Sequence, residues 1–86
     1  MATIKFNDFA ERYCGTNDRA EQIEELLDSL LYNVGFFVGV SEISEEELSE
    51  LFDTECQIEQ TYFEPNGYYD ITINGKYYCM SMIKII

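Results

Sequence analysis

The hydrophobic period changes once along the chain, near Cys56, and this change limits the fold more than any other feature. Before Cys56, apolar residues recur every three or four positions; after it, they alternate with polar residues. The first pattern predicts helices with one buried face, and the second predicts strands with one buried face. A chain of 86 residues has room for one domain. We therefore expect a single domain over residues 1–86, mainly helical and acidic over 1–55 and a β-meander over 56–86.

The clearest predicted helix covers residues 18–34. Asp18 and Glu21 have an acidic variant of the capping-box spacing, and Gly35 is suited to a left-handed C-terminal cap. One apolar stripe runs along this helix at helical spacing: Ile23, Leu26, Leu27, Leu30, Leu31 and Val34. We expect this stripe to face the core.

Two shorter helices are predicted on either side of it. The first covers residues 7–14, with Asn7 as its N-cap. The second runs from Ser44 to about Phe52, where Ser44 and Glu47 match the capping box S-x-x-E. Between the helices, residues 36–40 read FFVGV, which predicts either a short buried strand or a packed loop.

Three antiparallel strands are predicted over residues 56–63, 68–73 and 76–86. Asn74-Gly75 indicates a type I′ hairpin, whose two central residues both need positive φ; this turn pairs residues whose numbers sum to 149. The turn around Pro65 allows two loop lengths that place Tyr62 on opposite faces, so that register stays open. The expected fold is an α+β domain in two layers: two or three short helices on one face of a three-stranded antiparallel β-meander.

The composition excludes several functions. The chain has no His, which excludes Ser-His and Cys-His nucleophile pairs and imidazole metal ligands. Its five cations are scattered, so we expect no direct nucleic-acid binding. Residues 53–64 match the acid spacing of a calcium loop, but Ile58 stands where glycine is required. We expect no metal, no cofactor and no enzymatic activity.

The expected cellular location is inferred from the membrane-spanning and secretion segments that we do not find in the sequence. No stretch approaches the roughly 20 apolar residues that span a bilayer. The first residues lack the basic and apolar regions of a secretion signal. Three cysteines without a CxxC pair are typical of reduced thiols. We expect a cytoplasmic protein, in the host cytoplasm if it is viral, with no membrane partner.

The acids are concentrated in one block. The net charge is −12, and residues 42–59 hold eight acids and no cation. At a helical rise of about 1.5 Å per residue this is one charge per roughly 3.4 Å, as along one strand of B-DNA. A charged run usually serves as a solvated helix face, but this one lacks the Lys partners at i+4 that would support it. The block comprises Glu42, Glu45, Glu46, Glu47, Glu50, Asp53, Glu55 and Glu59.

Two further groups of residues are candidates for partner contact. Supporting acids project from the helix over 18–34: Glu21, Glu24, Glu25 and Asp28. Tyr68 and Tyr77 are predicted on the non-core face of the sheet, beside Cys79 and Ile83, where they either pack the sheet or form an exposed amphipathic patch. The last strand is apolar on both faces, which makes a homodimer through it an alternative.

Small, acidic α+β domains without catalytic residues resemble the inhibitors that phages and mobile elements use against nucleic-acid-handling enzymes, such as anti-CRISPR proteins and other DNA mimics. The leading hypothesis is a protein-binding inhibitor whose acidic face occupies the basic surface of a nucleic-acid-binding protein or nuclease complex. The alternatives are an immunity or antitoxin protein for a cationic nuclease, and a structural or adaptor protein that dimerises through its sheet.

Overall fold

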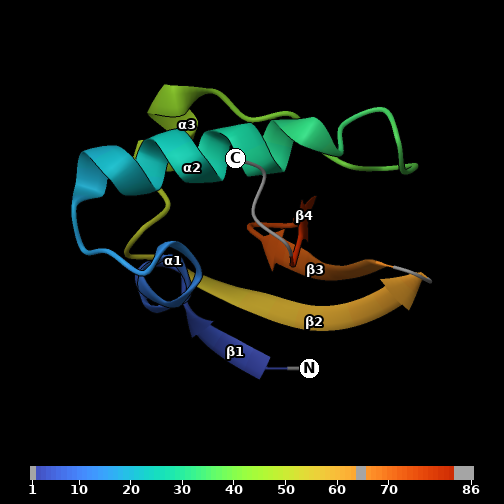
Figure 1. The fold of residues 1–86 in the computed structure, drawn as a ribbon, viewed down its shortest axis with the longest axis horizontal. Helices are drawn as coiled ribbons and strands as arrows, with labels where there is room; N and C mark the ends of the chain where they lie inside the picture. Colours follow the sequence, from blue (N-terminus) through green and yellow to red (C-terminus); the bar gives the residue numbers. More distant parts are fainter. Residues whose placement is uncertain (1, 64–65, 83–86) are drawn as a thin grey trace.

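A computed structural model describes residues 2–63 and 66–82 of the chain (Figure 1). Helices α2 and α3 lie on one side of the sheet, so the domain has two layers (Figure 1). Helix α1, seen end-on near the start of β2, packs on the same face through the contact of Phe9 with Tyr69. In chain order the elements are β1 (Ala2–Lys5), α1 (Phe6–Cys14), α2 (Arg19–Tyr32), α3 (Glu45–Ser49), β2 (Glu55–Phe63), β3 (Asn66–Ile73) and β4 (Lys76–Ser81). No helix among the described residues is long and apolar enough to cross a membrane.

The sheet has four antiparallel strands in the order β1-β2-β3-β4. The α+β class is therefore confirmed, but the prediction of three strands is wrong because β1 was missed. This strand pairs with the start of β2, with Ile4 opposite Cys56. No turn joins β1 to β2, and four residues are too few for a visible alternation. Its hydrogen-bonding partner lies some fifty residues away in sequence, so no local signal marks it.

The first helix begins without the N-cap expected at Asn7. The chain passes directly from β1 into α1, and Lys5 occupies the cap position without a side-chain hydrogen bond. Instead, the N–H groups of Phe6 and Asn7 donate to the carbonyls of Thr54 and Phe52, each at 2.9 Å. These backbone acceptors satisfy donors that a side-chain cap would otherwise serve.

Helix α2 begins as predicted and ends earlier. The Asp18 side chain accepts from the N–H groups of Ala20 and Glu21, which confirms it as the N-cap. The helix ends at Tyr32, with Asn33 as C-cap, rather than at Val34 with Gly35 as the cap. Asn33 is buried, and its Nδ2 donates to the carbonyl of Cys79 in β4 at 3.3 Å. The contact with β4 thus accompanies the earlier end of the helix.

The buried face of α2 is rotated from the predicted apolar stripe. Leu26 and Leu30 are fully buried as expected, but Leu31 is 40% exposed. Three polar side chains share the buried face with these leucines: Gln22, Ser29 and Asn33. A pattern based on hydrophobicity cannot locate such residues, because their burial depends on hydrogen bonds to other parts of the chain.

The second hairpin agrees with the predicted register. Ile73 pairs with Lys76 and Tyr69 with Met80. The turn residues Asn74 and Gly75 have φ of 51° and 78°, as a type I′ turn requires.

In the first hairpin Tyr62 pairs with Gly67 and Phe63 with Asn66, so the strands pair closer to the turn than either the three-residue or the four-residue loop would allow. Tyr62 lies on the same face as Ile58. The Tyr62 ring lies so close to Gly67 that a Cβ there would come within 3.1 Å of it. The turn residues 64–65 and the end of the predicted last strand, including Ile83, lie outside the described residues.

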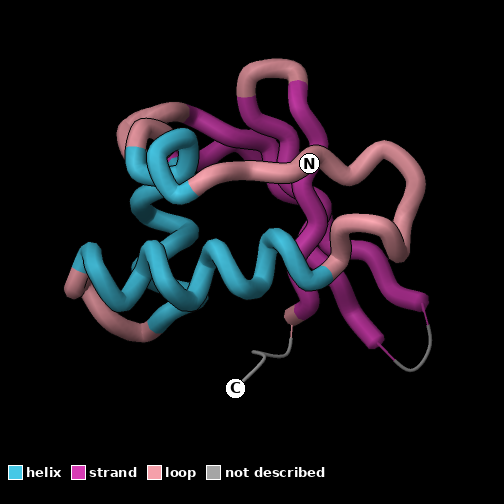
Figure 2. The backbone as a smooth tube through the Cα atoms, turned by 90° about the horizontal axis from the view of Figure 1, so that it is seen from above, coloured by secondary structure: helices cyan, strands magenta, loops and turns pink. Residues whose placement is uncertain are grey.

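The core lies between the helices and the sheet. Aromatic rings from α1 form part of this core. Phe9 meets Tyr69 of β3 edge-on, with 5.2 Å between ring centroids, and the centroids of Phe6 and Phe52 are 5.4 Å apart. The segment that follows α2 extends beyond the end of that helix before it returns to α3 (Figure 2). The expected burial of residues 36–40 is wrong for Phe36 and Val38, which are 70% and 101% exposed.

Candidate protein-binding surface

Six acids of the predicted block lie together around α3. Glu42 precedes the helix, three acids occupy its first turn, Glu50 is its C-cap and Asp53 follows in the next turn. All six side chains are exposed: Glu42, Glu45, Glu46, Glu47, Glu50 and Asp53. This set is called the α3 acids below.

The other two acids of the block lie on the sheet. Glu55 and Glu59 are odd-numbered residues of β2, whereas Ile58 packs against the core, so both carboxylates are on the outer face. Glu59 pairs directly with Asp70 of β3, and both line a shallow hollow on this face. The eight carboxylates therefore do not form one row: the chain direction changes at β2 and divides them between two faces.

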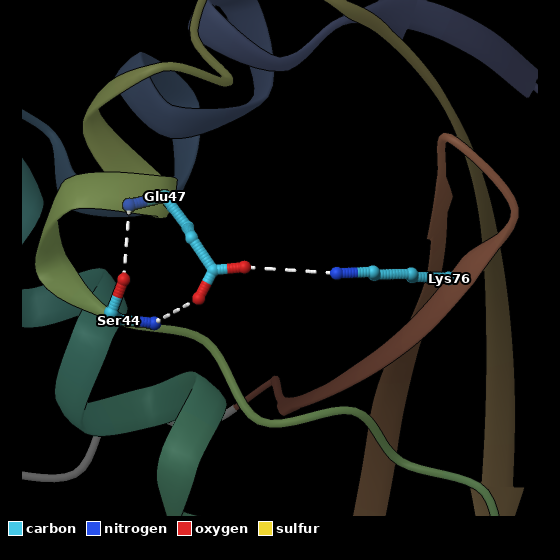
Figure 3. A network of polar contacts seen from close by, with 3 residues as sticks. All are labelled: Ser44, Glu47 and Lys76. Atoms are coloured by element: carbon cyan, nitrogen blue, oxygen red, sulfur yellow. Dashed lines mark hydrogen bonds and ion pairs between the residues drawn. The ribbon is translucent and has the colours of Figure 1, made fainter.

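Glu47 has a structural role as well as a charge. Its carboxylate accepts from the Ser44 N–H, and its own N–H donates to the Ser44 hydroxyl, at 3.1 Å each, which confirms the predicted capping box (Figure 3). The other carboxylate oxygen forms an ion pair with Lys76 at 3.6 Å. The hydrogen bond from the Ser44 backbone, with help from Lys76, lowers the pKa of Glu47. Among the α3 acids, Glu47 is the one whose carboxylate has hydrogen-bond and ion-pair partners within residues 2–63 and 66–82.

The supporting acids of α2 divide into exposed and half-buried positions. Glu21, Glu24 and Asp28 are exposed, whereas Glu25 is half-buried. The exposed three follow one another at spacings of three and four residues, and Tyr32 continues the series. They therefore form one stripe along α2 that leads to Tyr32.

The two candidate tyrosines are half-buried and hold contacts within the chain. The Tyr68 ring meets Phe37 edge-on, with 5.1 Å between ring centroids. The Tyr77 hydroxyl donates to the Asp70 carboxylate at 2.6 Å, and Thr61 donates to its other oxygen at 2.9 Å. Burial, together with the hydrogen bond to Asp70, raises the pKa of Tyr77. Of the two alternatives for these tyrosines, packing agrees with these contacts, and the segment that follows α2 covers part of this face.

The outer edge of β4 is also covered within the chain. Three alternate carbonyls along this edge accept hydrogen bonds from other elements. Tyr77 accepts from the Ser41 N–H at 2.8 Å, Cys79 accepts from Asn33 at 3.3 Å, and Ser81 accepts from the Tyr13 hydroxyl at 3.2 Å. A second copy of the chain would have to displace these donors before it could extend the sheet at β4.

Sequence reasoning missed one exposed feature, an apolar projection at the end of α2. Leu31 and Tyr32 are 40% and 54% exposed, and the exposed residues Phe36 and Val38 follow shortly after them in sequence. The rings of Tyr32 and Phe36 stack, with 5.7 Å between their centroids. We call these four residues the apolar tip. Gly35 and Gly39, with φ of 90° and 86°, enclose its outer part. The two glycines around FFV were the available sign that this apolar run turns rather than forming a buried strand.

Within the described ranges, no group of His, Cys, Asp or Glu side chains is arranged to hold a metal ion. Comparison of the chain with protein-family models, curated proteins and solved structures gives no match.

Proposed function

We propose that the chain is a protein-binding inhibitor, of the kind that phages and mobile elements deploy, and that it blocks the basic nucleic-acid-binding surface of a host enzyme. The observation that supports it is the exposure of the α3 acids around a short helix held by a capping box. The proposed site of action is the host cytoplasm. The proposal assigns the chain no catalytic step and no cofactor.

The charge of this region has little compensation from the chain itself. Between Arg19 and Lys76 the sequence contains no Lys or Arg. Lys76 pairs with Glu47, while Arg19 donates to Asn7 and lies over the Phe52 ring at 3.7 Å. The exposed carboxylates Glu46, Glu50 and Asp53 therefore project their field into solvent, where it attracts a cationic surface.

The needs of α3 itself do not explain the number of acids. Acids in the first turn of a helix are favourable, because the N–H groups there carry partial positive charge. This accounts for Glu45, Glu46 and Glu47. It does not account for Glu50, which lies at the C-terminal end where the partial charge is negative. Contact with a cationic partner gives a reason for acids at both ends.

A displacement assay with matched variants tests the proposal. A CRISPR effector complex, a cationic nuclease and a basic transcription factor would each hold a short fluorescent DNA duplex, and the chain would be titrated in. The test variant is Glu46→Lys/Glu50→Lys. The control variant is Asp8→Lys/Glu11→Lys, which reverses exposed acids of α1, including one in a first helical turn. Both change the net charge from −12 to −8, because each reversal adds two charges.

We expect the unmodified chain and the control variant to release the duplex from at least one protein, at low salt and less so at high salt. We expect the Glu46→Lys/Glu50→Lys variant to lose at least about tenfold in potency. No release from any of the three proteins would contradict the proposal, as would equal loss in both variants, which would indicate a response to net charge alone. Release from the nuclease only would identify the chain as an immunity or antitoxin protein.

A further inference from the structure

The apolar tip is held in place by the fold rather than left loose. Figure 1 shows the segment after α2 reaching beyond the end of the helix. Asn33 bonds to β4 at its start, Phe37 packs on Tyr68 in its middle, and the Ser41 N–H donates to Tyr77 at its end. These three contacts connect the segment to the sheet, so its conformation is set before any partner arrives.

The exposed members of the tip do little for folding. Val38 is fully exposed, and the only ring that Phe36 meets among the described residues is that of Tyr32, itself 54% exposed. Alternate residues of the same segment behave differently: Phe37 is half-buried against Tyr68. The segment thus uses one side to attach to the sheet and presents aromatic and aliphatic groups on the other, as binding hot spots do.

Acids flank the tip on both sides in sequence. The exposed stripe Glu21, Glu24 and Asp28 leads along α2 to Tyr32, one helical turn after Asp28, and Glu42 follows the tip. Because Asp28 and Tyr32 are four residues apart on one face of α2, acids border the apolar tip on its α2 side. A complementary surface has an apolar pocket with Lys or Arg at its rim.

A second copy of the chain is a poor occupant for this surface. Each copy carries a charge of −12 and would bring its own flanking acids to the contact. The tip exposes an area on the order of 500 Å², less than the roughly 800 Å² per partner of a standard interface. The remaining contact must come from the surrounding acids, which requires a cationic partner.

We propose that the apolar tip is the anchor of the complex, and that the basic partner carries an apolar pocket beside its cationic nucleic-acid channel. This inference rests on the proposed function and adds to it the feature that holds the complex once charge has brought the two proteins together. Preorganisation of the tip by Asn33, Phe37 and Ser41 limits the entropy lost on binding.

Substitution and photo-crosslinking at two matched positions test the anchor. The variant Phe36→Ser is compared with Tyr62→Ser, because the two side chains are equally exposed, at 70% and 68%, and Tyr62 lies at the far end of the first hairpin. The three DNA-loaded proteins of the displacement assay serve as probes. In parallel, each position receives the photo-crosslinker p-benzoylphenylalanine, and the adducts formed on illumination are identified by mass.

We expect Phe36→Ser to weaken displacement about tenfold or more, with the loss largest at high salt, and to leave the unfolding midpoint unchanged. We expect Tyr62→Ser to bind normally, and a crosslink to the displaced protein to form from position 36 only. Normal binding by Phe36→Ser, with binding lost in Glu46→Lys/Glu50→Lys, would overturn the anchor and leave the proposed function standing. A crosslink between two copies of the chain would overturn it in favour of a dimer. If no protein is displaced by the unmodified chain, both proposals are wrong.

Discussion

Three buried polar side chains determine how α2 sits on the rest of the domain. Gln22 donates to the Thr16 carbonyl at 2.8 Å, Ser29 shares a 3.1 Å hydrogen bond with the Tyr13 hydroxyl, and Asn33 donates to Cys79. An unsatisfied buried polar group costs about 1–3 kcal/mol, so these hydrogen bonds favour the rotation of α2 that makes all three. At the scale of single residues, specificity in this core comes from polar contacts as much as from apolar volume.

Removal of the Asn33 side chain tests this role. We expect Asn33→Ala to lower the free energy of unfolding by about 1–3 kcal/mol, because the buried Cys79 carbonyl loses its donor. The measurement is urea unfolding followed by circular dichroism. Asn17→Ala serves as the control, because Asn17 is exposed. Equal midpoints for the two variants would show that the contact with Cys79 does not stabilise the fold.

At the scale of elements, α3 is the clearest case of a helix that exists through its surroundings. Five residues are far too few for an isolated helix, because the first turn is costly to form. Leu48 is completely buried, and the capping box with Ser44 supplies partners at the first turn. Together these contacts hold the α3 acids on a defined frame, which a flexible acidic tail would not provide.

Two serines, one at each end of α3, allow a matched test of the capping box. We expect Ser44→Ala to reduce the free energy of unfolding by about 1 kcal/mol, because the Glu47 N–H loses its acceptor. Ser49→Ala makes the same chemical change in the same helix, where the hydroxyl bonds back to the Glu46 carbonyl. We expect that control to be neutral or slightly stabilising, since alanine is the better helix former. Thermal unfolding of both variants gives the comparison, and a smaller loss for Ser44→Ala than for Ser49→Ala would contradict it.

At the scale of the whole molecule, the domain carries a net charge of −12 within a radius of gyration of only 11.8 Å. The carboxylates repel one another at this size, which lowers the stability of the compact state. The α3 acids, the acidic stripe of α2 and the apolar tip are spread along α2, a helix about 21 Å long at 1.5 Å per residue (Figure 1). For the proposed basic partner, we therefore expect an elongated groove rather than a small round pocket.

The repulsion predicts a stabilising effect of salt. We expect the melting temperature to rise by several degrees when NaCl is increased from about 0.05 M to about 0.5 M, because the Debye length falls below the separation of most acids. The rise should be smaller for the Glu46→Lys/Glu50→Lys variant, in which the repulsion is already reduced. Differential scanning calorimetry provides the measurement. A melting temperature that falls with NaCl would show that favourable ion pairs outweigh the repulsion.

Features that depend on a few neighbouring residues could be predicted from the sequence. The Asn74-Gly75 turn, the Asp18 cap and the Ser44–Glu47 box depend on local φ values and short-range hydrogen bonds, so each was predictable. The exposure of the α3 acids also followed, since charged side chains without partners remain in water.

The tertiary structure decided the rest. Strand β1 exists only because β2 offers it a hydrogen-bonded edge, and α2 ends at Tyr32, where Asn33 meets β4. The apolar run at Phe36 is exposed because its neighbour Phe37 takes the place against Tyr68. Each of these outcomes depends on a group that lies far away in the chain. Hydrophobic pattern reports which residues are apolar, whereas the space available beside a distant element decides which of them are covered.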